Sequence, residues 1–271
     1  QFLCAILKDY DTRKTEIIHK LQTIGQKIFR KAYLMADMTV DHEGMQICTK
    51  PLVSFAGKLY TAPMSAVDCA VKTIGTCPRH NEAFITSGMV QYNACVGNFG
   101  GSGMAYSGSM NVLKNVLGNE YLWNNVRVKG GAYGCMCGFA PSGNGYFTSY
   151  RDPNLAKTYD IYANAADYVR SLALDDRELT KYIIGAVGAI DLPMTASMKG
   201  NRSLAAFLGE RSFEQIQKNR DELLATTVDD LRGLSKAVAS VIEAGHICVV
   251  GSESKITEEK DRFEYVAQLT Q

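Results

Sequence analysis

A β-hairpin in the middle of the chain limits the possible folds more than any other feature. Residues 132–151, AYGCMCGFAPSGNGYFTSYR, place the turn sequence SGNG between two apolar runs. Glycine and asparagine supply the backbone angles of tight turns, so this pattern is typical of two adjacent antiparallel strands. Residues 82–99 also have strand composition, and residues 246–252, HICVVGS, read as a closing strand.

Segments with helical spacing surround these strands. Helices are expected over residues 9–31, 105–126, 152–174, 175–190, 197–208, 212–225 and 228–244, with a polar last helix after the closing strand. Apolar stripes mark the first two, namely Ile17, Ile18, Leu21, Ile24 and Ile28, then Met110, Leu113, Val116 and Leu117. The order of strands and helices predicts an α+β domain with helices packed on one face of a largely antiparallel sheet.

Capping residues predict where three of the helices begin. Asp11 or Thr12 suits the start of the first helix. Asp152 suits the N-cap of the helix over 152–174, because Pro153 follows at the first helical position. Asp175 or Asp176 suits the helix after it.

A less regular stretch separates the first helix from the sheet domain. Residues 32–41, AYLMADMTVD, read as a strand that a turn at DHEG closes. Residues 44–80 carry Pro51, Pro63 and Pro78, with a short helical stretch near 64–74. We therefore expect a linker or boundary over 44–80 and a new domain over 81–271.

Composition excludes several kinds of partner. The formal net charge is +1, which gives no reason to expect nucleic acid or a membrane surface. No apolar run reaches the roughly 18 residues that span a bilayer, and we expect no secretory leader. The chain begins at Gln1, as a fragment or a processed protein would. The eight cysteines are scattered among apolar residues, which favours reduced, buried thiols and a cytoplasmic protein.

Other candidate sites have simpler interpretations. The stretch GNFGGSG, residues 97–103, lacks the Lys-Ser/Thr of a phosphate-binding loop and favours a strand-to-helix loop. His19, His42, His80 and His246 do not stand at metal-ligand spacing. Cys135 and Cys137 are more typical of structural thiols than of metal ligands. We therefore expect no metal site in this chain.

One pair of residues points to chemistry. Within LWNNVRVKGGAYGCMCGF, residues 122–139, Arg127 and Tyr133 would lie about 20 Å apart in a continuous strand. Gly130 and Gly131 permit a bend that brings them together. A guanidinium and a phenol at one point can both donate to a peptide carbonyl, as in an oxyanion hole. A surface charge and a core aromatic residue fit the spacing equally well.

Four motifs carry a resemblance to a known family. YLWNNVRVKGGAYG, GNGYFTSYRDPNL, LTKYIIGAVGAID and KGNRSLAAFL resemble the C-terminal part of pitrilysin/insulinase-type zinc metallopeptidases, and most closely the presequence-protease and falcilysin group. The resemblance covers about residues 81–256, and it implies that residues 1–43 end a preceding α+β domain. It also implies a clamshell of two halves, each made of two similar domains.

The resemblance implies roles for particular residues. Arg127 and Tyr133 match the arginine and tyrosine that reach across the chamber to the substrate backbone and stabilise the tetrahedral intermediate. Lys129 and Arg151 are candidates for the chamber lining and for plain surface charge alike. Zinc is implied in the first domain, held by an inverted H-x-x-E-H motif and a distant glutamate, and that motif is absent from this sequence.

The parent protein is therefore expected to hydrolyse unstructured peptides in a closed chamber with a zinc-activated water. Its partners would be the peptide and a zinc-bearing N-terminal half or partner subunit, in the cytoplasm or a eukaryotic organelle matrix. This chain alone would be inactive and free of zinc. The alternatives are a non-catalytic structural subunit of the same fold, or a module that binds peptides by adding a strand to its sheet.

Overall fold

The computed structural model describes residues 2–62 and 81–269, and the chain forms two compact units. Unit 1 combines Gln1–Gly75 with Met194–Glu210, and unit 2 combines Thr76–Pro193 with Arg211–Gln271. The hairpin and the Arg127–Tyr133 segment both belong to unit 2. The short helix expected near residues 64–74 lies outside the described residues.

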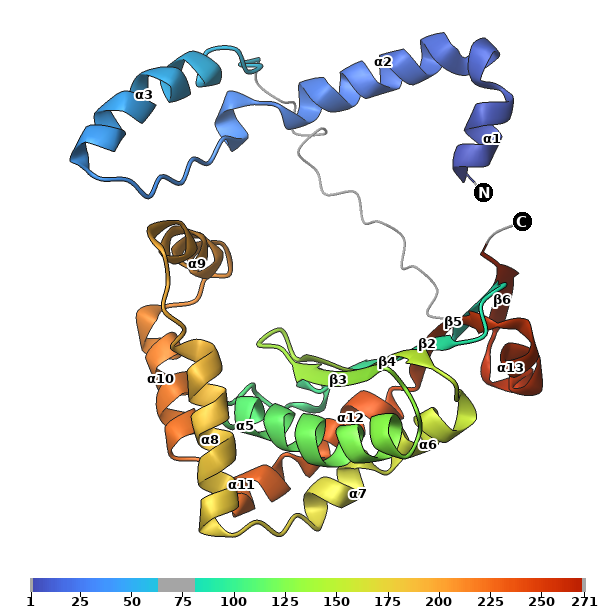
Figure 1. The fold of residues 1–271 in the computed structure, drawn as a ribbon. Coiled ribbons are helices and arrows are strands. Elements are labelled where there is room, and N and C mark those ends of the chain that lie inside the picture. Colours follow the sequence, from blue (N-terminus) through green and yellow to red (C-terminus); the bar gives the residue numbers. More distant parts are fainter. Residues whose placement is uncertain (1, 63–80, 270–271) are drawn as a thin grey trace. The chain divides into compact units, whose positions relative to one another are not determined.

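A six-stranded mixed sheet forms the frame of unit 2 (Figure 1). Its strands, in spatial order, are β3 (Gly134–Phe139), β4 (Asn144–Asp152), β2 (Gln91–Asn98), β5 (His246–Ser252), β1 (Glu82–Thr86) and β6 (Tyr265–Gln268). The pairs β3–β4, β4–β2 and β2–β5 are antiparallel, whereas β1 is parallel to β5 and to β6. The predicted hairpin is the β3–β4 pair, and Gly143 in its turn has a φ of 84°.

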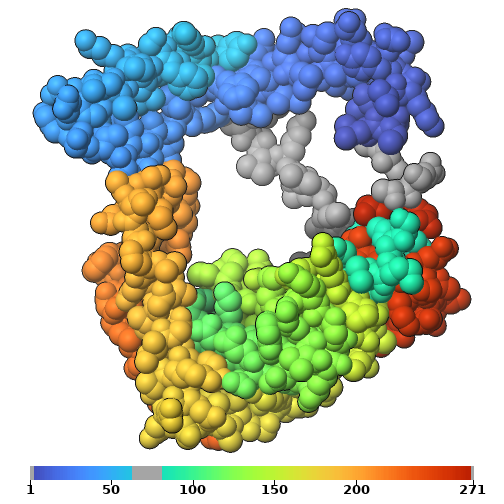
Figure 2. All heavy atoms as spheres, in the orientation of Figure 1, coloured from blue at the N-terminus to red at the C-terminus, as the bar shows by residue number. Residues whose placement is uncertain are grey.

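Helices cover one face of this sheet (Figure 1). They are α5 (Ser109–Val116), the π-helix η3 (Leu117–Val128), α6 (Ala156–Ala163), α7 (Ala165–Arg170) and α12 (Ser235–Glu243). The helices α8 (Asp176–Ile190), α10 (Phe213–Leu224) and α11 (Val228–Gly233) pack around α5. The space-filling view shows the side chains of unit 2 closing the space between its ribbons (Figure 2).

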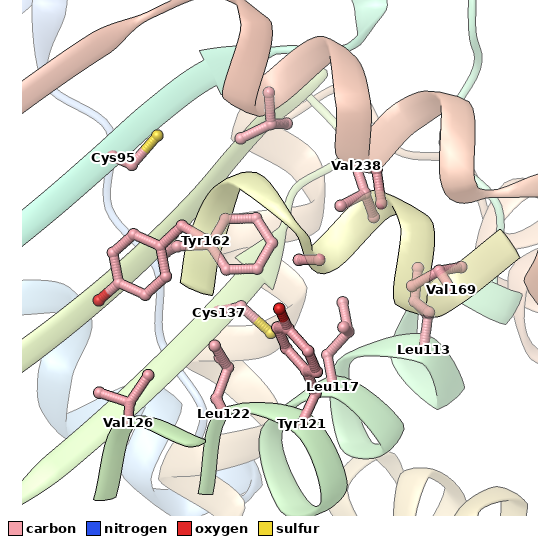
Figure 3. Close-up of a cluster of buried hydrophobic side chains, with 14 of the residues drawn as sticks. Cys95, Leu113, Leu117, Tyr121, Leu122, Val126, Cys137, Tyr162, Val169 and Val238 are labelled. Atoms are coloured by element: carbon pink, nitrogen blue, oxygen red, sulfur yellow. The ribbon is translucent and has the colours of Figure 1, made fainter. Parts of the chain in front are cut away.

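The core lies between the sheet and this helical layer (Figure 3). Leu113, Leu117, Leu122 and Val126 of α5 and η3 are all buried, and Leu122 lies near Cys137 of β3 whereas Leu113 lies near Val169 of α7. Side chains along β2 and β4 alternate between buried and exposed, so each strand buries one face only. These observations confirm the α+β fold with helices on one face of a largely antiparallel sheet.

Unit 1 is helical in the part that the structure describes. Its elements are α1 (Phe2–Lys8), α2 (Tyr10–Ile28), the 3₁₀ turn η1 (Lys31–Tyr33), α3 (His42–Ala56) and α9 (Ala196–Leu208). No side chain of α2 or α3 is buried, so the predicted Ile17–Ile28 stripe forms without a core to cover it. The helix over 42–56 also shows that the first part of the expected linker is regular.

The strand predicted over residues 32–41 is wrong. Residues 34–41 have no regular secondary structure, because no neighbouring strand of unit 1 is present among the described residues to pair with them. The predicted DHEG turn is instead the start of α3, where the Asp41 side chain accepts a hydrogen bond from the Gly44 N–H at 2.7 Å. The turn residues were therefore helix-capping residues.

Other differences concern helix ends and one missed strand. Residues 152–174 form two helices, and the first begins at Ala156, so Asp152 and Pro153 do not start it. Residues 228–244 also form two helices, α11 and α12. The N-cap of α2 is Asp9 rather than Asp11 or Thr12, and its side chain accepts no capping hydrogen bond. The polar last helix, α13 (Glu253–Glu258), is followed by the 3₁₀ turn η4 (Lys260–Arg262) and by β6.

Of the two predicted caps for the helix over 175–190, Asp175 is the N-cap of α8. Its side chain accepts a hydrogen bond from the Glu178 N–H at 2.8 Å in a capping box. No helix among the described residues is both long enough and apolar enough to cross a membrane.

Candidate functional site

The chain bends sharply between η3 and β3. Gly131 has a φ of 82°, a left-handed conformation that favours glycine. A Cβ atom at Gly130 would overlap the backbone carbonyl of Val126. The Ala132 N–H donates to that same carbonyl at 3.1 Å, which closes the turn. Both glycines are therefore required where the helix passes into the strand.

The bend places Arg127 and Tyr133 in direct contact. The Arg127 guanidinium donates a hydrogen bond to the Tyr133 backbone carbonyl. Its central carbon lies 5.5 Å from the centroid of the Tyr133 ring and 4.3 Å from the Trp123 ring. A guanidinium over an aromatic face is held by cation–π attraction. Arg127 is therefore fixed from two sides, while the Tyr133 side chain remains exposed.

A second arginine approaches the same phenol. The Arg151 guanidinium carbon lies 5.6 Å from the Tyr133 ring centroid. The Tyr133 N–H donates to the Arg151 carbonyl at 3.3 Å, and the Tyr150 ring meets the Tyr133 ring edge-on at 5.5 Å between centroids. Lys129 has a different neighbour, because its amine donates to the Asn125 Oδ1 at 3.4 Å.

A buried polar cluster fixes the end of β4 beneath these residues. The fully buried Asp152 carboxylate accepts from the Ser149 and Thr158 hydroxyls, both at 2.7 Å, and from the Asn154 N–H at 2.9 Å. The Asn154 side chain donates to the Gly130 carbonyl at 2.6 Å. The segment after β4 therefore holds the glycine bend in place. Asp152 performs this role in place of the helix-capping role that the sequence predicted.

An exposed apolar surface adjoins the arginine–tyrosine cluster. Its members lie on the sheet face opposite the helices, and they are Tyr92, Val96, Met136, Tyr146 and Tyr150. Glycines on β3 make room for two of these rings. A Cβ atom at Gly134 would overlap the Tyr150 ring, and one at Gly138 would lie 2.6 Å from the Tyr146 ring. We call these five residues the open face.

The remaining candidate residues have structural surroundings. Burial raises the pKa of Cys95 to about 11 and that of Cys137 to about 12, so both remain protonated thiols at neutral pH. In the glycine-rich loop, the Phe99 N–H donates to the Gly143 carbonyl at 2.7 Å and the Gly101 N–H donates to the Asn98 side chain at 2.8 Å. These amides are engaged within the protein rather than pointing at a phosphate.

Metal-binding groups do not gather among the residues that the structure describes. Over residues 2–62 and 81–269, no three His, Cys, Asp or Glu side chains lie close enough to hold a metal ion together. Trp123 and the Asp152 cluster are parts of the site that the sequence did not single out as such, and Arg151 was only a candidate for the chamber lining. The sequence signal for the cluster is Asp-Pro-Asn directly after the hairpin. It follows Arg151 and supplies Asp152 and Asn154, which hold the end of β4 and the glycine bend.

Comparison with known proteins identifies relatives of this chain. The model of the PreP C-terminal domain matches residues 81–255. Protein HypA of Clostridium perfringens is 39% identical over 191 residues, which are 70% of this chain and 20% of HypA. Presequence protease 1, chloroplastic/mitochondrial, of Arabidopsis thaliana is 33% identical over 257 residues, which are 94% of this chain and 24% of that protein.

Among solved structures, a protease from Helicobacter pylori superposes with a TM-score of 0.53 at 14% identity. The match covers 78% of this chain and 52% of that one, and it shows a shared fold. The chain spans no more than about a quarter of the two curated relatives, 20% and 24% of their lengths. Since the family model covers well over half of the chain, the chain belongs to the PreP family and contains its C-terminal domain.

Proposed function

We propose that this chain is the C-terminal portion of a zinc-dependent peptidase and that it holds the peptide substrate through Arg127 and Tyr133. Membership of the PreP family supports the peptidase activity. The observation that carries the residue roles is the placement of a fixed guanidinium beside an exposed phenol at the margin of the open face. Residues 1–43 would then end the preceding domain.

The geometry suits the binding of a peptide carbonyl. An arginine has five N–H donors, and among the described residues the Tyr133 carbonyl engages one guanidinium nitrogen of Arg127. The remaining donors and the Tyr133 hydroxyl would point at the substrate. Two donors aimed at a carbonyl oxygen stabilise the negative charge that develops there during hydrolysis. The open face would contact the apolar side chains of an unfolded peptide.

Zinc would be bound by the part of the parent that precedes this chain. Among the described residues of this chain, no three His, Cys, Asp or Glu side chains could hold a metal ion together. Zinc would supply an activated water to the reaction. The cytoplasm or an organelle matrix remains the expected compartment, and the name of the Arabidopsis relative refers to chloroplasts and mitochondria.

A non-catalytic structural subunit, or a peptide-binding module, of the same fold is the alternative. The gene upstream of this segment distinguishes these possibilities, because the peptidase requires an H-x-x-E-H motif in the same reading frame or in a partner subunit. Metal analysis of the purified 271-residue chain adds a second criterion. One tightly bound zinc per chain, together with chelator-sensitive cleavage of peptides, would contradict the proposed division of labour.

The role of Tyr133 can be tested in the full-length peptidase. Tyr133→Phe removes the hydroxyl donor and keeps the ring, so we expect kcat/KM on a short peptide to fall by about 10²–10³. The melting temperature should change little, because the side chain is 56% exposed. Tyr265→Phe is the matched control, since Tyr265 is a half-exposed tyrosine at the far edge of the sheet. Full activity of Tyr133→Phe would refute the proposed role.

A further inference from the structure

Arg151 occupies an irregular position in β4. Gln91 of β2 pairs with Asp152 and Asn93 pairs with Ser149, so the register shifts between these pairs. Over this interval two residues of β4, Tyr150 and Arg151, lie opposite one residue of β2. Such an arrangement is a β-bulge, a feature that bends a strand and redirects a side chain.

The bulge changes the direction of the Arg151 side chain. In a regular strand consecutive side chains point to opposite faces of the sheet. Here Tyr150 and Arg151 are consecutive and both exposed, whereas Ser149 and Asp152 on either side are both buried. Arg151 therefore lies on the same side of the sheet as Tyr150 and Tyr133 instead of pointing into the core.

The backbone at Arg151 is held in an unfavourable conformation. Its φ is 48°, and only one other described non-glycine residue, Glu210, has a positive φ. Residues without a tendency toward this region adopt it only when the surrounding structure enforces it. The buried Asp152 cluster supplies that enforcement, because it fixes the residues on both sides of the bulge.

The contacts of Arg151 converge on Tyr133. Its guanidinium lies 5.6 Å from the Tyr133 ring centroid, and its carbonyl accepts from the Tyr133 N–H. None of the ion pairs of the described residues involves Arg151. A surface ion pair thus does not account for the position of the Arg151 guanidinium, which instead lies near the Tyr133 ring.

We propose that Arg151 is a positioning residue for Tyr133: the bulge aims its guanidinium at the phenol ring, and this contact keeps the Tyr133 hydroxyl directed at the substrate. The inference rests on the proposed function, since it concerns the same phenol. Arg151 acts on the reaction only through Tyr133. Loss of its side chain should therefore lower kcat more than it raises KM, because a mobile phenol stabilises the transition state less well.

The decisive variant is Arg151→Gly in the full-length peptidase. Glycine adopts a φ of 48° without strain, so the variant should melt at or above the temperature of the unmodified protein. We expect kcat to fall at least tenfold with KM nearly unchanged. Glu210→Gly is the matched control, because it relieves the same backbone conformation at φ 50° in unit 1 and should leave kcat unchanged. Arg151→Asn also tolerates this conformation and replaces the glycine variant if that one does not fold.

A double-mutant cycle separates positioning from an independent contact. If Arg151 acts through Tyr133, Arg151→Gly should have no further effect in the Tyr133→Phe background. If the double variant instead shows the product of the two single losses in kcat, the proposal is overturned. Full activity of Arg151→Gly would overturn it as well. A silent Tyr133→Phe would instead contradict the proposed function itself. An active Arg151→Gly beside an impaired Tyr133→Phe would contradict only the role of Arg151.

Discussion

At the scale of single residues, Arg127 combines two functions that lysine could not combine. Its guanidinium carbon lies 4.3 Å from the centroid of the Trp123 ring, and the same group donates a hydrogen bond to the Tyr133 carbonyl. A lysine ammonium is a compact charge without this planar fork. The position therefore requires the geometry of arginine as well as its charge.

Arg127→Lys should reduce turnover although it preserves the charge. A hydrogen bond to a charged group contributes about 1.5–3 kcal/mol, which corresponds to a roughly ten- to hundredfold loss in kcat/KM. Steady-state kinetics on a short peptide would measure the loss, with thermal melts as the folding control. Arg170→Lys is a comparison at an exposed ion pair with Asp167, and it should have no kinetic effect. Equal kcat/KM for the two variants would show that geometry at Arg127 is unimportant.

The sequence predicted the meeting of Arg127 and Tyr133 but not their neighbours. Two adjacent glycines indicated the bend, because few other residues tolerate such a turn. Arg151 was only one of several candidates, since its approach to Tyr133 depends on the register of β4 and on the bulge. Asp152 was assigned to a helix cap because Asp-Pro commonly begins helices, and only the fold shows that it binds Ser149 and Thr158 instead.

At the scale of elements, two predictions with clear signals at the ends of the element are confirmed. The hairpin and the helix over 175–190 were predicted correctly, because turn residues and a capping box define their ends. The strand over 32–41 failed, since strand formation depends on a neighbour that a local pattern does not reveal. The four-residue strand β6 was missed because so short a segment carries little periodicity.

The bend between η3 and β3 offers a test at this scale. Gly131→Ala places a Cβ atom on a residue with a φ of 82°, which should destabilise the protein by about 1–2 kcal/mol and lower its melting temperature. Activity should fall as well, because the bend sets the separation of Arg127 and Tyr133. Gly188→Ala in α8 is the matched control, since its Cβ atom meets nothing within 4 Å. That substitution should stabilise the helix by up to about 1 kcal/mol. Similar melting temperatures for the two variants would contradict the requirement for glycine at 131.

At the scale of the whole molecule, the two units differ in how well they bury their apolar residues. Unit 2 encloses a continuous core beneath its sheet. In unit 1, by contrast, Leu21, Ile24 and Ile28 of α2 are each at least half exposed. An apolar helical stripe of this kind is normally covered by another element. This exposure supports the proposal that residues 1–43 complete a domain whose other elements lie outside this chain.

Limited proteolysis of the chain tests the proposed boundary over residues 44–80. Exposed and loosely packed connections are cleaved before compact units, and this connection joins unit 1 to unit 2. Because α3 is regular as far as Ala56, the first cuts should fall after it and before β1 begins at Glu82. Trypsin can cleave there after Lys58, Lys72 or Arg79. N-terminal sequencing and mass spectrometry of the earliest large fragment should therefore identify a product that begins at Leu59, Thr73 or His80. Early cuts within residues 153–193 or 211–245, with 44–80 still intact, would show that the boundary lies elsewhere.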